Sequence, residues 1–427
     1  MNTSKNKYRL TGLLLSGGLW ASAQNVADKA IFNGDQLFST VKTYVAKGEH
    51  RTGTPGDFAT SAWLADELKQ AGYTVRYHEF PLKQFFLEKA AVTEGSHAYD
   101  AFPLWYVSET IPSEVTGVVT TEGEDVKGKV VLLRFSGQGG QTEKETAQKL
   151  RELVDKGAKA IIGYSENKVG EIVAYNAPKV PQPWKVPVVV VAPATAKALA
   201  ARKGQQVRVS VKGTFKEITA RNVYGTIGNG KEYVVVSTPI SGWFGCGGER
   251  GPGLAAWLAL AQWAAASKLP YTFVFTGNSG HELGGLGAHA FLDHGAPPVE
   301  KTKLWIHLGA AIATLSYHAT PSGLAADNKV DDQRNFYYSS SVQKSFTAAF
   351  APVPGLKFDT KQRAGGELVY VIDKGYPNVA GAAYSHPYFH TKGDTPATTS
   401  PALLQEVSLA FKTFLENELA PRQVAQH

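Results

Sequence analysis

The second half of the chain alternates short, continuous apolar runs with helical segments, and this alternation constrains the fold more than any other feature. Residues 232–240, 271–277 and 303–309 are apolar runs, and helical patterns cover residues 252–266 and 283–293 between them. Strands that are apolar throughout are typical of parallel sheets buried on both faces. We therefore predict an α/β fold with a mostly parallel (mixed) sheet covered by helices on both faces.

In the first half of the chain, a different pattern of apolar and helical segments interrupts this alternation. From residue 87 to residue 216, short β-like runs alternate with one strong helical segment, residues 143–156. A length of 427 residues allows two or three domains. We expect a smaller β-rich insert over residues 87–216, between a first part (24–86) and a second part (217–427) of the main domain.

The first 23 residues have the pattern of an export signal. Lys5, Lys7 and Arg9 precede an apolar stretch, and small residues at positions 21 and 23 predict a cut before Gln24; a buried N-terminal helix is the alternative. No later apolar run approaches the ~20 residues that span a membrane. Lys and Arg (44) only slightly exceed Asp and Glu (37), which argues against nucleic-acid binding. We expect a secreted or periplasmic protein.

Histidines gather where the predicted strands end, and sites in open parallel sheets lie at the carboxyl ends of strands. His281 and Glu282 follow the strand 271–277 directly. They are either a metal ligand and a proton acceptor at one centre, or polar residues at the start of a helix, where Glu282 complements the helix dipole. His386 and His390 lie in a loop rich in Pro, Gly and aromatic residues. His307 lies within an apolar strand, as a ligand or as a hydrogen-bonded core residue.

Two further loops at the strand ends carry reactive side chains. Residues 241–253 are rich in glycine and include Cys246, Glu249 and Arg250. Cys246, the only cysteine, is either a reactive thiol or a buried apolar residue. Arg250 is a candidate to bind a substrate carboxylate, with a surface salt bridge as the alternative. Glu367, in the loop that begins at Gly365, is a further substrate-binding candidate.

The chain resembles the dizinc aminopeptidases, a family that includes bacterial leucyl-type aminopeptidases and glutamate carboxypeptidase-like proteins. The resemblance is carried by HRTGTPGDFATSAWLADELKQAGYTV, GEDVKGKVVLLRF, DKGAKAIIGY, KVPVVVVAPATAKAL and YFHTKGDTP, and it covers nearly all of the chain after the signal. It implies that residues 87–216 form an inserted protease-associated domain. It also implies a peptidase activity that depends on zinc.

The chain departs from this family at several metal-binding positions. The His-x-Asp of the family corresponds to Pro239 and Ser241, and the Asp after the third strand corresponds to Gly309. The Glu-Glu pair, catalytic base then ligand, becomes His281-Glu282. The two-zinc site is therefore incomplete, and one zinc ion is the more consistent expectation. The retained candidates for metal ligands are Glu282, His390, Glu249 and His307.

Three functions remain open from the sequence. In the first, the chain is a hydrolase of amide or peptide bonds with a mononuclear metal site and His281 as general base. In the second, Cys246 is a nucleophile activated by His281 without a metal. In the third, the chain is a non-catalytic secreted binding protein. For the enzyme, the expected partner is a small peptide or amide-type substrate, with Arg250, His386 and Glu367 as substrate-binding candidates.

Overall fold

The computed structural model describes residues 28–136, 140–141, 144–321, 323–331, 334–354, 356 and 364–420. The expected export signal, residues 1–23, lies outside this range. Within the described residues, no helix combines the length and the apolar character needed to cross a membrane.

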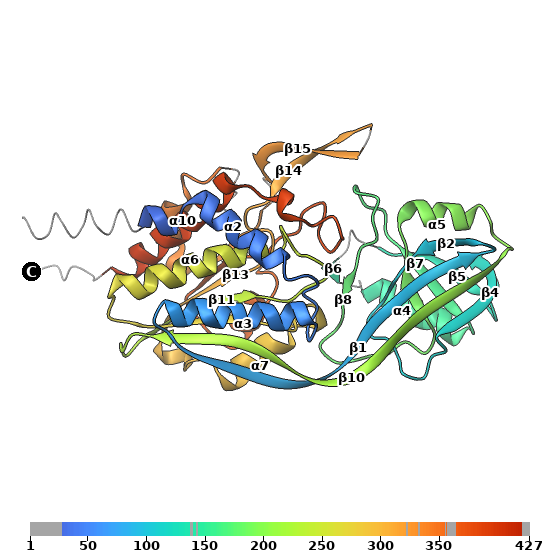
Figure 1. Ribbon diagram of the computed structural model, residues 1–427, viewed down its shortest axis with the longest axis horizontal. Helices are drawn as coiled ribbons and strands as arrows, with labels where there is room; N and C mark the ends of the chain where they lie inside the picture. Colours follow the sequence, from blue (N-terminus) through green and yellow to red (C-terminus); the bar gives the residue numbers. More distant parts are fainter. Residues whose placement is uncertain are drawn as a thin grey trace, which may run out of the picture.

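Figure 1 shows the arrangement of the described helices and strands. The helices are α2 (Gly34–Val45), α3 (Pro55–Gln70), α4 (Lys144–Asp155), α5 (Pro193–Ala200), α6 (Gly251–Ser267), α7 (Leu286–His294), α8 (Gln343–Phe350), α9 (Leu368–Asp373) and α10 (Pro401–Leu419), with short 3-10 turns η1 (His281–Leu283), η2 (Val299–Lys301), η3 (Ser340–Val342) and η4 (Pro396–Thr398). The strands are β1 (Thr74–Glu94), β2 (His97–Asp100), β3 (Phe102–Pro103), β4 (Glu114–Thr121), β5 (Val130–Arg134), β6 (Gly140–Gln141), β7 (Ala160–Tyr164), β8 (Tyr175–Asn176), β9 (Val188–Val190), β10 (Gln206–Ile227), β11 (Tyr233–Pro239), β12 (Thr272–Asn278), β13 (Thr302–Leu308), β14 (Leu315–Thr320), β15 (Gly323–Val330), β16 (Phe336–Tyr338) and β17 (Val379–Ala382).

The main sheet confirms the predicted α/β class. Strands β17, β13, β11 and β12 are neighbours and run parallel, whereas β16 and β10 close this group with antiparallel pairs. Val234 and Val236 of β11 pack in the core that includes α2, α6 and α10. Val235 between them packs in a second core with α7 and α9. Helices thus cover both faces, which is why these strands are apolar at successive positions.

Two long strands connect the main domain to the insert. β1 and β10 form one antiparallel ladder, from Thr74 opposite Thr226 to Thr93 opposite Arg208, with an irregularity between Leu87 and Lys89. β10 pairs with β12 of the main sheet at one end and with β4 of the insert at the other. In Figure 1 this ribbon runs from beneath α3 to the insert, where β4, β5, β7 and β9 form a parallel group. The limits that we propose for the insert, residues 87 and 216, fall inside these two strands.

Candidate functional site

The carboxyl ends of β11, β12, β13 and β17 lie at one edge of the main sheet, and most of the candidate residues lie at that edge. A pocket of about 560 Å³ opens there. Its lining residues are Asn176, His281, His307, Gly309, Ala310, Gly365, Gly366, Val369, Tyr370, Ala383, Tyr384, Ser385 and Phe389. Strand-end loops of the main domain and one residue of the insert region therefore share this pocket.

His281 and Glu367 form a pair beside the pocket. The Nδ1 atom of His281 lies 3.1 Å from Oε1 of Glu367, and the amide of Asn278 donates to Oε2 of Glu367 at 3.1 Å. Burial raises the pKa of Glu367, but the hydrogen bond and charge of His281 outweigh it, so this pKa is lower than usual. A buried carboxylate thus orients the His281 ring. The His281 side chain is 14% exposed, which leaves it open to the pocket.

His307 is the second histidine at the pocket. Its Nδ1 atom lies 2.9 Å from the hydroxyl of Ser237, which accepts a hydrogen bond from Nε1 of Trp305. Burial lowers the pKa of His307 to about 4, so the imidazole is neutral at pH 7. Gly366 lies beside both histidines, since a Cβ atom there would lie 3.9 Å from Cε1 of His281 and 4.0 Å from Nε2 of His307.

Glu249, Arg250 and His390 form a separate, fully buried group. Nη2 of Arg250 lies 2.7 Å from Oε1 of Glu249, and Nε2 of His390 lies 3.2 Å from the same oxygen. Nδ1 of His390 donates to the carbonyl of Ala174 at 3.0 Å. Although burial raises the pKa of Glu249, Arg250 and His390 outweigh this and lower it to about 2. Glu249 is therefore a carboxylate at any working pH.

Glu282 is buried beside this group, and both of its oxygens are already engaged. The backbone N–H of Thr52 donates to Oε1 at 2.6 Å, and the hydroxyl of Ser241 donates to Oε2 at 2.8 Å. The N–H of His281 in turn donates to the Ser241 hydroxyl at 3.1 Å. Glu282 thus holds the Ser241 hydroxyl, which in turn holds the backbone of His281 in place.

Arg250 and His386 occupy places that differ from those expected of substrate-binding residues, whereas Cys246 has the buried position that was one of its two alternatives. Arg250 neither lines the pocket nor forms a surface salt bridge, because its guanidinium is wholly buried against Glu249. His386 lies away from the pocket lining, with Nε2 at 3.4 Å from Asp394. The Cys246 thiol is buried, donates to the carbonyl of Trp243 at 2.8 Å, and has a pKa raised by burial and by Glu249. A nucleophilic thiol needs the opposite environment.

Several residues of the site escaped sequence reasoning. Asn278 and Ser237 hold Glu367 and His307, yet Ser237 is one of two adjacent polar residues near the end of an apolar run and gives no distinct signal. Asn278 follows the expected strand 271–277 directly, and that position was the one signal available for it. Thr52 contributes through its backbone, for which no residue type is diagnostic.

The residues do not fit the two-zinc site that the resemblance implies. A Cβ atom at Gly309 would lie 2.2 Å from the carbonyl oxygen of Ala382, so this position is closed to a ligand side chain. Pro239, at the end of β11, offers no donor. A pair of ions needs donors at both positions.

A single zinc ion meets a different obstacle. Both oxygens of Glu249 and Nε2 of His390 are buried without a well-formed hydrogen bond, as in a metal site. However, Glu282 is engaged and the guanidinium of Arg250 contacts Glu249. In the part of the chain that the structure describes, no three His, Cys, Asp or Glu side chains are arranged to hold a metal. The donors therefore do not fit a zinc ion as they stand, and we derive the chemistry of the site from its side chains.

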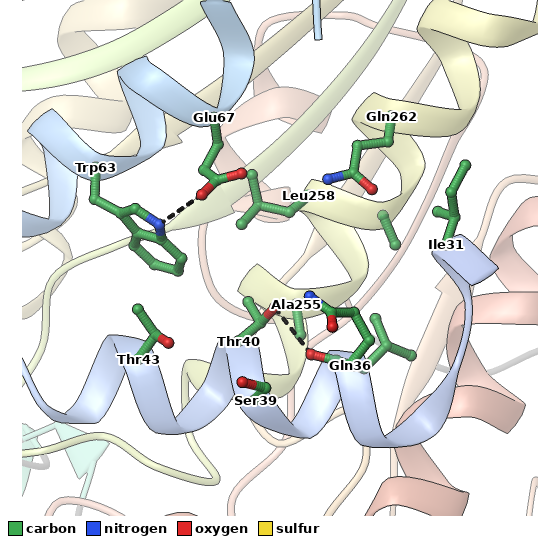
Figure 2. A pocket seen from close by; sticks show the side chains of 12 residues that line it. Ile31, Gln36, Ser39, Thr40, Thr43, Trp63, Glu67, Ala255, Leu258 and Gln262 are labelled. Atoms are coloured by element: carbon green, nitrogen blue, oxygen red, sulfur yellow. Dashed lines mark hydrogen bonds between the residues drawn. The ribbon is translucent and has the colours of Figure 1, made fainter. Parts of the chain in front are cut away.

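A second pocket lies on the helical face, far from these strand ends. Figure 2 shows it between α2, α3 and α6, with Trp63 donating to Glu67 at 3.0 Å. Its volume is about 190 Å³, and no histidine or cysteine lines it. The pocket at the sheet edge is larger, at about 560 Å³, and two histidines, His281 and His307, line it.

Comparison with known proteins finds two family models that match parts of the chain. Residues 249–415 match the model of peptidase family M28, and residues 93–199 match that of the PA domain. The probable lipoprotein aminopeptidase LpqL of Mycobacterium tuberculosis (strain ATCC 25618 / H37Rv) is 28% identical over 200 residues. That match covers 44% of this chain and 39% of the length of LpqL.

Solved structures of low sequence identity share the fold across most of the chain. A zinc aminopeptidase of Bacillus subtilis is 17% identical, with a TM-score of 0.72 over 90% of this chain and 95% of the other. An aminopeptidase of Aneurinibacillus sp. strain AM-1 is 18% identical, with a TM-score of 0.66 over 92% and 96%. These likenesses and the two family models confirm the resemblance seen in the sequence. Residues 249–415 thus resemble peptidase family M28, and the region that matches the PA domain, residues 93–199, precedes them in the chain.

Proposed function

We propose that this protein is a hydrolase of the aminopeptidase type, which cleaves an amide or peptide bond in the pocket at the sheet edge. The observation that carries the proposal is the pair formed by His281 and Glu367 beside that pocket. The family match and the aminopeptidase relative support the reaction class. A binding protein needs no such pair, and the buried, protonated thiol of Cys246 does not support a nucleophilic cysteine.

His281 is the general base of this proposal. Glu367 is ionised, so it accepts the proton on Nδ1 of His281 and leaves Nε2 with a lone pair. From the pocket wall, Nε2 removes a proton from the attacking water and later returns it to the leaving amine. The products are a carboxylic acid and an amine, and His281 returns to its starting protonation state at the end of each cycle.

His307 assists by polarising the carbonyl group. The Ser237 hydroxyl accepts from Trp305 and can donate its own hydrogen to one of two acceptors. Nδ1 of His307 lies 2.9 Å from this hydroxyl, and the carbonyl of Ile306 lies 3.4 Å from it, so the hydroxyl donates to His307. Nε2 of the neutral ring then carries a proton toward Gly366 and the pocket. A preorganised donor of this kind stabilises the negative charge that develops on the carbonyl oxygen.

The test is turnover of a peptide library and a panel of aminoacyl amides, followed by mass spectrometry. We expect release of N-terminal residues by the wild-type protein, and a loss of about 10²–10⁴-fold in kcat/KM for His281→Ala. His294→Ala, which removes an exposed histidine at the end of α7, is the matched control. Equal turnover in wild type and His281→Ala contradicts the assigned base, and no turnover by either contradicts the hydrolase.

We also propose that the protein is exported and that residues 1–23 are removed. The basic start, the apolar stretch and the small residues before Gln24 support this, as does the lipoprotein name of the relative. N-terminal sequencing of the protein from its native host should begin at Gln24. A mature chain that retains Lys5 would contradict it.

A further inference from the structure

Arg250 is the most deeply buried cation of the site, and its position is fixed from two sides. Its side chain is 0% exposed, and Nε donates to the carbonyl of Ser241 at 2.9 Å. On the other side, Nη2 lies 2.7 Å from Glu249. Burial disfavours the charged guanidinium, yet Glu249 and other nearby groups outweigh this and raise the pKa of Arg250. Both members of the pair are therefore charged.

The surroundings of Arg250 are those of a metal ion. Ser241 connects it to Glu282, because the Ser241 carbonyl accepts from Arg250 and its hydroxyl donates to Glu282. His390 approaches Glu249 from the other side, with its Nδ1 tied to a backbone carbonyl. A histidine held in this way by its second nitrogen is typical of metal ligands. One carboxylate, Glu249, thus pairs directly with a buried positive charge that belongs to the chain itself, while His390 reaches that charge through Glu249 and Glu282 reaches it through Ser241.

We propose that Arg250 replaces the metal ion of this site, so that the protein keeps its fold and its pocket without zinc. The guanidinium neutralises Glu249, the charge that would otherwise attract an ion. It also repels an incoming cation, since like charges interact strongly in a buried setting. The inference is independent of the proposed hydrolase reaction, because it concerns metal content and stability and not turnover.

The experiment measures metal content by elemental mass spectrometry and thermal stability with and without added zinc chloride. We expect wild-type protein to purify without stoichiometric zinc, and its Tm to stay unchanged after chelator treatment or zinc addition. Arg250→Ala removes the ion-pair partner of Glu249 and leaves its oxygens beside Nε2 of His390, atoms that form no hydrogen bond in the wild-type structure. This variant should bind one zinc ion and gain Tm on zinc addition, because a ligand specific for the folded state stabilises it.

Two variants separate this effect from a general loss of a buried arginine. Arg334→Ala removes another buried guanidinium, which donates to the backbone carbonyls of Ile312 and Pro354 and not to Glu249, and this variant should gain no zinc. The double variant Arg250→Ala/His390→Ala should lose the zinc response. If Arg250→Ala does not fold, Arg250→Gln keeps a donor for Ser241 and serves in its place.

Either of two results overturns the proposal. One is a stoichiometric zinc ion in wild-type protein whose removal lowers the Tm. The other is a folded Arg250 variant that takes up no zinc. Neither result depends on whether a substrate has been found, so failure here differs from failure of the hydrolase proposal.

Discussion

At the scale of single residues, the site depends on buried carboxylates that each have a different partner. Glu367 holds a histidine, Glu282 holds a serine hydroxyl and a backbone N–H, and Glu249 holds an arginine. Burial alone raises the pKa of Glu367 and of Glu249, and in both cases the partner outweighs it, so these two charges persist. The pairings therefore assign separate roles to residues of one chemical type.

Glu367→Gln tests the orientation of His281. The amide cannot accept as strongly or stabilise a charged imidazolium, so we expect kcat to fall about 10–100-fold. KM should change little, and circular dichroism should be unaltered. Glu300→Gln, an exposed position in η2, is the control. A KM effect with unchanged kcat would instead make Glu367 a substrate-binding residue.

Asp57, at the start of α3, gives the protein a pH-dependent stability. It accepts from Gly53 at 2.8 Å, and burial raises its pKa from 3.8 to about 7. The folded state therefore holds a proton on Asp57 that the unfolded chain has lost between pH ~4 and ~7. Its stabilisation is fully present below the unfolded pKa and is lost as the pH rises through about 7.

Asp57→Asn removes this titration. The free energy of unfolding of the variant, relative to wild type, should rise from pH 4 to pH 7 by an amount on the order of 4 kcal/mol. Urea denaturation at a series of pH values measures it. Asp66→Asn, an exposed position on the same helix, should give a flat difference. A flat difference for Asp57→Asn as well would mean that Asp57 is ionised in the folded protein.

At the scale of elements, helix and strand positions were predictable and the loop geometry was not. The sequence predicts a helix over residues 252–266, and α6 spans Gly251–Ser267, because Pro252 suits a helix start and the following residues are apolar. The loop before it is held by Asp394, which accepts from the N–H groups of Gly248 and Glu249. That contact joins residues that are remote in sequence, so no local sequence pattern predicts it. Arg250 pairs with the adjacent Glu249 because both side chains are buried in this loop, and it was the burial of the loop that the sequence did not reveal.

Gln84 on β1 connects three elements. Its amide donates to the carbonyl of Thr52 at 2.9 Å, and its oxygen accepts from Nε1 of Trp105 at 3.2 Å. Gln84→Ala leaves both groups buried and unpaired, each at a cost of about 1–3 kcal/mol. We expect a loss of about 2–5 kcal/mol in urea denaturation. Lys212→Ala, an exposed change on β10, should cost under about 0.5 kcal/mol, and a similarly small loss for Gln84→Ala would mean that water replaces it.

At the scale of the whole molecule, the ribbon of β1 and β10 couples the two domains, because both domains share these strands. Its ladder is continued by β12 in the main sheet and by β4 in the insert. We expect a single calorimetric unfolding transition, because neither domain can unfold without breaking strands of the other. Two resolved transitions, one of them confined to residues 93–199, would show that the insert melts independently.

The same ribbon sets an order in which the chain can fold during synthesis. Thr74 pairs with Thr226 and Thr93 with Arg208, so β1 leaves the ribosome long before its partner exists. Contacts between such distant segments form late, because the intervening loop must first be closed. The parallel strands and helices of the insert, complete before β10 is made, shorten that loop when they fold. Folding of the insert therefore brings β1 and β10 close together in the nascent chain, so that the two long strands can pair in register.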